Sequence, residues 1–188
     1  MNGSVESREM SENIQPFIHP TAIVEDGATL GSGVGVWHYA HVRAGATIGA
    51  NSQIGKSAYV DVGVRIGARC KVQNFVSVYG GVTLGDDVFI GPSVTFTNDL
   101  HPRSFGEWIL IPTYVHDGAS IGANSTIVCG NDIGPYSMVG AGSVVVRPVG
   151  ERELVVGNPA KLLGYVCLCG LRSESNIGAC DHGQKLHL

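Results

Sequence analysis

The chain has 188 residues, and its composition suits one folded domain better than a nucleic-acid-binding or membrane protein. Hydrophobic residues make up 44% of the sequence, 27 residues are glycine, and the formal net charge is −4. A chain of this length predicts one domain, and the negative charge argues against a polyanion-binding surface. The sequence has no apolar run of about 18 residues and no charged-then-apolar leader, so we expect a cytoplasmic protein with no membrane partner.

Residues 1–16 are polar and predict a disordered or loosely docked N-terminal arm. After them, a repeat with a period of six residues dominates the chain. From Ile18 to Phe96 every sixth residue is apolar, and the residue four places after each of these anchors is small or a modest aliphatic. The period resumes from Val115 to Val145. Six residues is the period of a parallel β-helix, whereas an amphipathic helix or a coiled coil would not hold it.

Each hexapeptide predicts a short strand followed by a corner. The large anchor points inward, and glycine often comes next, as in Ile48-Gly49 and Ile66-Gly67. Such a glycine suits either unusual backbone dihedrals or close stacking of the coils. Three hexapeptides complete one coil of a triangular prism, with about 4.8 Å between coils. The sequence therefore predicts an all-β solenoid over residues 17–150.

The repeat is interrupted once and then ends. After Phe96 the next anchor, Val115, comes nineteen residues later. Residues 97–114 are therefore expected to form a loop that protrudes from a corner, and such insertions usually lie on the functional face. Residues 151–166 depart from the period and predict a short C-terminal cap over the open end of the core, followed by a polar tail at 167–188.

The segment from Lys71 to Arg103 resembles a known family. The matching words are Val72-Gln73-Asn74, Ser77-Val78-Tyr79, Asp86-Asp87-Val88-Phe89, Gly91-Pro92-Ser93, Phe96-Thr97-Asn98 and Pro102-Arg103. They resemble the nucleotide-amino-sugar N-acetyltransferases of bacterial polysaccharide biosynthesis, which are hexapeptide-repeat acyltransferases. The resemblance implies a left-handed parallel β-helix, whereas the general rule for parallel crossovers favours the right hand. It also implies a homotrimer that transfers acetyl from acetyl-CoA to a UDP- or dTDP-linked 3-amino sugar.

Acetyl transfer to an amine needs a thioester beside a neutral amine, a donor for the oxyanion and a route for the proton. The resemblance places a catalytic His-Pro in the protruding loop, which corresponds to His101-Pro102. Histidine suits a general base at neutral pH. The alternative is a histidine that only contacts substrate, because an amine can also bind already neutral.

Asn74 resembles the residue that contacts the sugar amine in the family; the alternative is a structural asparagine at a corner. Asn98 and Asp99 are expected either to orient His101 and bind sugar hydroxyls or to form an Asx-type turn. The predicted substrate-binding residues are Gln73, Tyr79, Asn98, Asp99 and Arg103.

The family binds the pantetheine arm of CoA through backbone groups of late coils. The corresponding residues are Gly122, Ala123, Ala141 and Gly142. Arg147 and Lys161 are candidates to pair with the CoA phosphates, or are solvated charges near the cap.

No metal is expected for catalysis. The tail fragment from Val166 to Gly170 resembles a family segment that forms a zinc ribbon in some relatives. Structural zinc usually needs about two to four residues between paired ligands. The candidate ligands here, each pair separated by one residue, are Cys167, Cys169, Cys180 and His182. This spacing favours a degenerate, mobile tail over a zinc ribbon.

Three other functions remain open. An O-acetyltransferase on a sugar hydroxyl would need His101 as its base. A γ-type carbonic anhydrase would need three closely grouped histidines, which His38, His41, His101 and His116 do not provide. A non-catalytic solenoid scaffold would not need the loop or the His-Pro pair.

Overall fold

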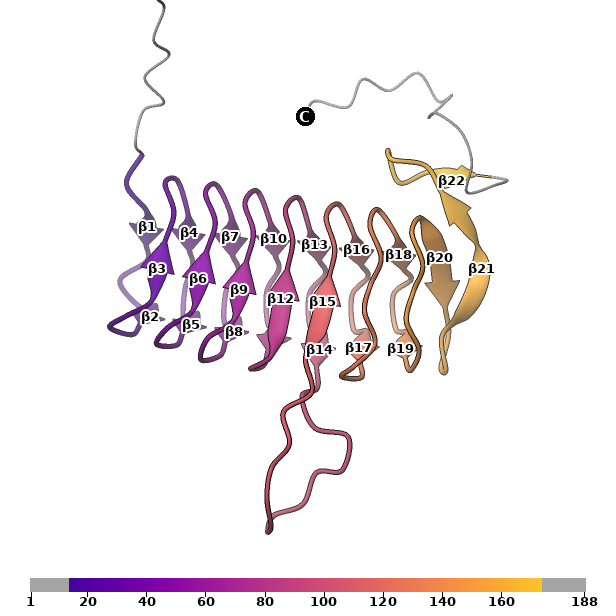
Figure 1. Ribbon diagram of the computed structural model, residues 1–188. Coiled ribbons are helices and arrows are strands. Elements are labelled where there is room, and N and C mark those ends of the chain that lie inside the picture. Colours follow the sequence, from indigo (N-terminus) through magenta and orange to yellow (C-terminus); the bar gives the residue numbers. More distant parts are fainter. Residues whose placement is uncertain (1–13, 174–188) are drawn as a thin grey trace, which may run out of the picture.

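Residues 14–173 are described by the structure, a computed structural model, and they form one parallel β-solenoid (Figure 1). Three sheets form the walls of a prism. Wall A contains β1 (Phe17–Ile18), β4 (Gly35–Val36), β7 (Gln53–Ile54), β10 (Lys71–Val72), β13 (Phe89–Ile90), β16 (Ser120–Ile121), β18 (Met138–Val139) and β20 (Glu153–Val156).

The other two walls follow in the order of the chain. Wall B contains β2 (Ile23–Val24), β5 (His41–Val42), β8 (Tyr59–Val60), β11 (Ser77–Val78), β14 (Thr95–Phe96), β17 (Thr126–Ile127) and β19 (Val144–Val145). Wall C contains β3 (Thr29–Leu30), β6 (Thr47–Ile48), β9 (Arg65–Ile66), β12 (Val82–Leu84) and β15 (Thr113–Val115). We call the turns that lead from one wall to the next the A–B, B–C and C–A edges.

The prism winds with a left hand. In Figure 1 the chain advances from left to right while it climbs the near wall that holds β3 and β6 and returns along the far wall that holds β1 and β4. This confirms the all-β, left-handed parallel β-helix. It differs from the general preference for right-handed crossovers, which applies to connections that pack back onto a single sheet.

The six-residue period sets the register of the walls. Val36 pairs with Ile54, and Ile54 with Val72, so each anchor stacks on the one eighteen residues later. The anchors from Val36 onward are almost fully buried, and Phe96 is the largest of the fully buried side chains. The core is therefore a column of aliphatic side chains along the prism axis, which the repeat predicted.

The glycine after an anchor serves close stacking. A Cβ atom on Gly49 would lie 2.5 Å from the carbonyl carbon of Gly67, in the next coil, and one on Gly91 would lie 2.7 Å from the nitrogen of Ala123. Left-handed dihedrals instead fall three residues after an anchor, where even Phe75 has a φ of 60°. Of the two explanations for these glycines, the structure supports contact between coils.

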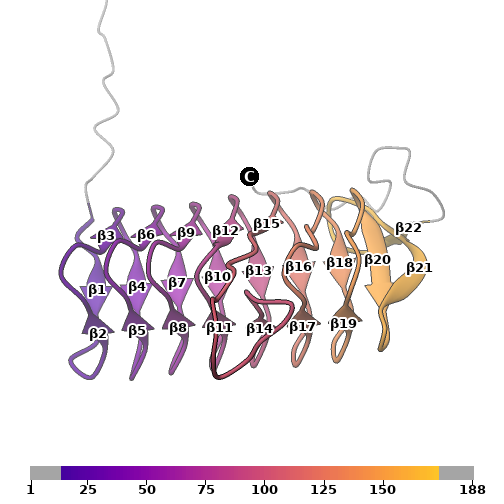
Figure 2. The same ribbon diagram turned by 60° about the horizontal axis from the view of Figure 1, so that its bottom comes forward.

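The predicted loop leaves the prism at the B–C edge. It connects β14 to β15 and projects well beyond the other turns (Figure 1). In the view of Figure 2 it lies in front of the walls. Its base is closed by a 2.9 Å hydrogen bond from the Ile111 N–H to the Asn98 carbonyl. The loop lengthens this coil, so Ile90 pairs with Ile121, thirty-one residues later, and wall A continues without a break.

The C-terminal end of the prism folds back on itself. β20 pairs in parallel with β18 and then antiparallel with β21 (Lys161–Val166), which pairs with β22 (Arg172–Ser173). Buried Arg152 donates a 3.0 Å hydrogen bond to the Val166 carbonyl. Within residues 14–173 no helix is long and apolar enough to cross a membrane. Most of the predicted arm and tail lies outside the described residues.

Candidate functional site

The predicted site residues lie on two different edges of the prism. The A–B edge carries Gln73, Asn74, Gly122, Ala123, Ala141 and Gly142. The B–C edge and its loop carry Tyr79, Asn98, Asp99, His101, Arg103 and Arg147. Lys161 begins β21 at the end of the prism. Wall B separates the two edges, so a single chain does not bring Asn74 and His101 together.

Successive coils stack equivalent positions along the A–B edge. The position two residues after each wall A anchor recurs as His38, Lys56, Asn74, Pro92, Ala123 and Ala141. The carbonyls from His38 to Ala123 each accept a hydrogen bond from the next coil, as from the Ser93 N–H to Asn74 at 2.9 Å and from the Gly142 N–H to Ala123 at 2.8 Å. The edge is therefore one straight column in which the candidate amine-binding and CoA-binding positions follow each other.

Asn74 has a structural contact at this edge. Its side-chain Oδ1 accepts a 2.9 Å hydrogen bond from the backbone N–H of Lys56 in the preceding coil. Asp86 caps a preceding coil in the same way at the C–A edge, where its Oδ1 accepts from the Ala68 N–H at 2.8 Å. Within residues 14–173 the Nδ2 group of Asn74 makes no hydrogen bond. Corner stabilisation and substrate contact are therefore compatible, because they use different atoms of the amide.

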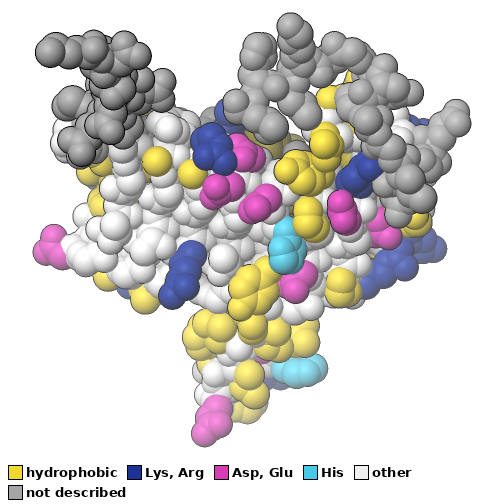
Figure 3. Space-filling model, turned by 45° about the horizontal axis from the view of Figure 1, so that its top comes forward, with side chains coloured by type: hydrophobic (Ala, Val, Ile, Leu, Met, Phe, Trp, Pro, Cys, Tyr) yellow, Lys and Arg dark blue, Asp and Glu magenta, His cyan; other side chains and the backbone are white. Residues whose placement is uncertain are grey.

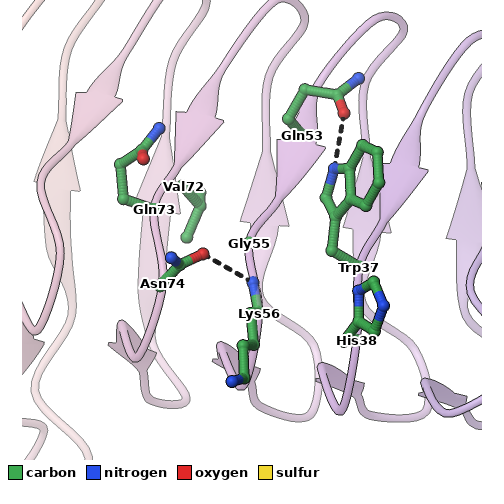
Figure 4. Close-up of a pocket in the computed structure, with 8 residues that line it drawn as sticks. All are labelled: Trp37, His38, Gln53, Gly55, Lys56, Val72, Gln73 and Asn74. Carbon is green, nitrogen blue, oxygen red and sulfur yellow. Dashed lines mark hydrogen bonds between the residues drawn. The ribbon is translucent and has the colours of Figure 1, made fainter.

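A hollow of about 240 Å³ lies beside Asn74 on the surface of wall A. It is lined by Trp37, His38, Gln53, Gly55, Lys56, Val72, Gln73 and Asn74 (Figure 4). The Trp37 Nε1–H donates a 3.0 Å hydrogen bond to the Gln53 Oε1, which fixes the orientation of the indole. Sequence reasoning identified Gln73 and Asn74 but missed Trp37, Gln53 and Lys56. The signal was present, since His38, Lys56 and Asn74 follow each other at the eighteen-residue spacing of the coils.

A second hollow of about 300 Å³ lies further along the same wall and is mostly apolar. It is lined by Phe89, Ser120, Ile121, Gly122, Met138, Val139, Gly140 and Ala141. Two of the four predicted pantetheine-binding residues, Gly122 and Ala141, are among them. The small residues leave backbone groups accessible at this part of the edge.

The loop residues are exposed, and their polar contacts are local. The Asp99 Oδ1 accepts a 2.8 Å hydrogen bond from the backbone N–H of His101, which is the Asx-type turn considered for this residue. The Arg103 Nη1 donates to the Pro102 carbonyl at 2.8 Å. In one chain the His101 imidazole is thus open to solvent, free to meet a group from outside.

A network of charged side chains lies at the start of the B–C edge. The Glu25 Oε1 lies 2.6 Å from Arg43 Nε and 2.8 Å from His41 Nε2, and its Oε2 accepts a 2.9 Å bond from the Ala44 N–H. The Ala44 N–H hydrogen bond, with help from His41 and Arg43, lowers the pKa of Glu25 against the effect of its partial desolvation.

The network continues toward Tyr79. Arg43 Nη1 donates to the Tyr59 hydroxyl at 2.9 Å, and that hydroxyl donates to Asp61 Oδ1 at 3.0 Å. Burial alone would raise the pKa of Asp61, but hydrogen bonds from backbone N–H groups bring it below its ordinary value. The ring of Tyr79 lies 5.7 Å from that of Tyr59. The alternating charges at 25, 43 and 61 again follow the coil spacing.

Within residues 14–173 no group of three histidine, cysteine, aspartate or glutamate side chains could hold a metal ion. Cys180 and His182 lie outside the described residues. The prediction of a tail without zinc, and its zinc alternative, therefore both stay untested.

Two family models match the repeat. The bacterial transferase hexapeptide model, of six repeats, matches residues 63–98, and the hexapeptide repeat of succinyl-transferase matches residues 45–80 and 112–147. Together the two models match residues 45–98 and 112–147, so the six-residue repeat of this chain is of the hexapeptide type that they describe. Among the relatives of this hexapeptide-repeat protein is a dTDP-3-amino-3,6-dideoxy-α-D-galactopyranose 3-N-acetyltransferase of Aneurinibacillus thermoaerophilus, 51% identical over 86 residues. The match covers 45% of this chain and 42% of the relative.

Other matches are less specific. Serine acetyltransferase 4 of Arabidopsis thaliana is 40% identical over 91 residues, which cover 48% of this chain and 21% of the relative. The chain thus matches less than half the length of either curated relative. A solved N-acyltransferase from Bacillus cereus, in complex with dTDP and coenzyme A, superimposes with a TM-score of 0.59 at 18% identity, over 77% of this chain and 83% of that one. At this identity the likeness concerns the fold.

Proposed function

We propose that this hexapeptide-repeat protein is an acetyl-CoA-dependent N-acetyltransferase acting on the amine of a nucleotide-linked deoxyamino sugar. The observation that carries the proposal is the single A–B edge, along which the small-residue hollow at Gly122 and Ala141 leads to the polar hollow at Asn74. A thioester bound at the first hollow would point toward an amine bound at the second. The identity with a dTDP-amino-sugar N-acetyltransferase supports the same reaction.

In the proposed reaction the amine nitrogen attacks the thioester carbonyl carbon. An N–C bond forms, the C–S bond breaks, and the products are an amide and CoA. The nitrogen loses one proton, for which His101 is the proposed base, and the CoA sulfur gains one. The free Nδ2–H of Asn74 is a donor, so it suits an oxygen of the sugar or of the thioester. Glycine and alanine backbones near 122 and 141 hold the pantetheine arm.

The proposed assembly is a homotrimer, because Asn74 and His101 lie on different edges of one chain. A second prism beside the A–B edge would bring its own loop to the Asn74 of the first. The loop suits such a contact, since Phe105, Trp108 and Ile109 expose 77%, 58% and 65% of their surface. Figure 3 shows hydrophobic side chains gathered over the projecting loop. Exposed apolar patches of this kind mark interaction surfaces.

The reaction is tested by measuring thiol release from acetyl-CoA with a panel of UDP- and dTDP-linked amino sugars and their hydroxyl analogues. Release with an amine but not with its hydroxyl analogue supports the proposal, and the panel decides between UDP and dTDP. Release with the hydroxyl analogue alone would replace it by O-acetyl transfer. No release and no CoA binding would reject both and favour a scaffold. A place in bacterial polysaccharide synthesis and a cytoplasmic location stay predictions.

The shared site is tested by mixing two inactive variants, His101→Ala and Asn74→Ala. If each site takes Asn74 from one chain and His101 from its neighbour, about a quarter of the sites in randomly mixed trimers contain both native residues. Activity should then recover after the chains are exchanged. Absence of recovery in a mixture shown by sedimentation to be trimeric would contradict the arrangement.

A further inference from the structure

The hollow beside Asn74 has a shape that follows from three consecutive turns of the A–B edge. Trp37, Gly55 and Gln73 occupy equivalent positions one residue after their wall A anchors. Gly55 has no side chain, and a Cβ there would lie 2.8 Å from the Asn74 nitrogen. Trp37 and Gln73 are therefore separated by a gap two coils wide, roughly 10 Å. Figure 4 shows them on opposite sides of the bare Gly55 turn.

One wall of this gap is aromatic and fixed in place. Trp37 exposes 42% of its surface, yet its indole is hydrogen-bonded to Gln53 and its ring centroid lies 5.3 Å from that of Phe17. Next to it, His38 stacks on His19 with 3.4 Å between ring centroids. Rings that are already ordered lose little entropy when a planar group stacks on them, and nucleobases are such groups.

The edge between the aromatic wall and Asn74 carries a cation. Lys56 lines the hollow, and its Nζ lies 5.9 Å from the centroid of the Phe75 ring. Within residues 14–173 no carboxylate forms an ion pair with this ammonium group. A lysine without a carboxylate partner, in a hollow that Gln73 and Asn74 also line, suits a phosphate group.

The geometry points to a nucleoside-diphosphate subsite in this hollow, with the diphosphate beside Lys56 and the base against Trp37 and His38. The inference deepens the proposed function and rests on it for the sugar. Along the column, Asn74, Lys56 and His38 come in the same order as the amino sugar, the diphosphate and the nucleoside in a nucleotide-linked sugar. A volume of about 240 Å³ holds only part of such a molecule, so the rest extends along the edge.

CoA also contains a nucleoside diphosphate, so the experiment must separate the two sources. Calorimetric titration of the full chain with dTDP, UDP and CoA, each alone, is carried out on wild type, Lys56→Gln and Trp37→Ala. We expect each substitution to weaken dTDP or UDP binding about tenfold or more and to leave CoA affinity within about twofold. Lys71→Gln is the matched control, since Lys71 is exposed on β10 and does not line the hollow. Its dTDP and UDP affinities should equal those of wild type.

Tryptophan fluorescence gives a second readout that does not depend on the folding of an alanine variant. The chain has two tryptophans, so Trp108→Phe leaves Trp37 as the only reporter. In this variant dTDP should quench the emission at saturation, whereas CoA should not. In the matched variant Trp37→Phe, where only Trp108 reports, the quenching assigned to Trp37 should be lost.

Three outcomes would overturn the inference: no binding of dTDP or UDP to wild type, unchanged affinity in both Lys56→Gln and Trp37→Ala, or a loss of CoA affinity instead. Failure of the subsite can be distinguished from failure of the proposed function. Acetyl transfer with unchanged KM in both variants would leave that function standing and remove the subsite. Nucleotide binding that depends on Lys56, in a protein that releases no thiol with any amine, would keep the subsite and reject the proposed function.

Discussion

The Oδ1 of Asn74 accepts a hydrogen bond from the backbone N–H of Lys56 at 2.9 Å, so the amide proposed to meet the substrate also joins two coils of the prism. The corresponding cap at the C–A edge, Asp86, is a carboxylate. Aspartate therefore keeps this structural contact while it removes the amide donor. The two roles of Asn74 can be separated by comparing two substitutions.

We predict that Asn74→Asp preserves stability and loses activity, whereas Asn74→Ala loses both. The alanine variant should lower the free energy of unfolding by about 1 kcal/mol, because the Lys56 N–H loses its partner. The aspartate variant should stay within about 0.5 kcal/mol of wild type but lose about tenfold or more in kcat/KM. Urea unfolding and thiol-release kinetics measure the two effects. An aspartate variant with full activity would remove the donor role.

His101→Ala should act on the reaction alone. The contact that holds this residue uses its backbone N–H, which any residue but proline supplies, so the free energy of unfolding should stay within about 0.5 kcal/mol. If His101 is the base, kcat/KM should fall about a hundredfold. His101→Gln is the control for side-chain size and should be equally inactive. Retained activity in both variants would mean that the amine binds neutral and is only positioned.

Two nearby glycines should respond differently to alanine. A Cβ on Gly67 would lie 2.5 Å from the carbonyl carbon of Gly85, so Gly67→Ala should push the coils apart and cost about 3 kcal/mol. Gly63 has a φ of 68° and no neighbour within 4 Å, so Gly63→Ala should cost only about 1 kcal/mol of backbone strain. Chemical unfolding of both variants checks the order. The reverse order would contradict the stacking explanation.

The Glu25 network predicts a loss of stability in acid. The folded pKa of Glu25 lies below its ordinary value of 4.5, so folding favours the carboxylate. Its contribution is therefore complete above pH 4.5 and disappears as the pH falls through the lower folded value. Glu25→Gln should have a lower Tm than wild type at pH 7, and the difference should shrink below pH 4.5. A Tm difference that stays constant from pH 7 to pH 3 would argue against this assignment.

The period explains why the fold could be predicted and part of the site could not. Ile54 and Val72 are buried and paired because spacing alone determines which face of a strand they occupy. The place of the loop after Phe96 followed from the same counting. The position of His101 relative to Asn74 did not, because it depends on a second chain and on loop dihedrals that carry no repeat.

Residues missed by sequence reasoning were those whose meaning depends on neighbours in other coils. Lys56 looks like a solvated charge until Gly55, Trp37 and Asn74 are seen around the same hollow. Glu25 and Arg43 look independent until the eighteen-residue spacing places them in contact. Residues separated by one coil are therefore neighbours in this fold, as residues separated by one helical turn are neighbours in a helix.

The straight column along the A–B edge spaces equivalent positions at fixed intervals of one coil. Because each coil adds about 4.8 Å, the distance between two groups on this edge is set by the number of coils between them, whatever their side chains are. Insertion of one complete coil of eighteen residues between Lys56 and Asn74 would move the two apart by one step, and the inserted coil would then have to supply the acceptor for the Lys56 N–H. The distance between the groups that bind the two ends of a substrate can thus change by whole coils, independently of the chemistry at either end.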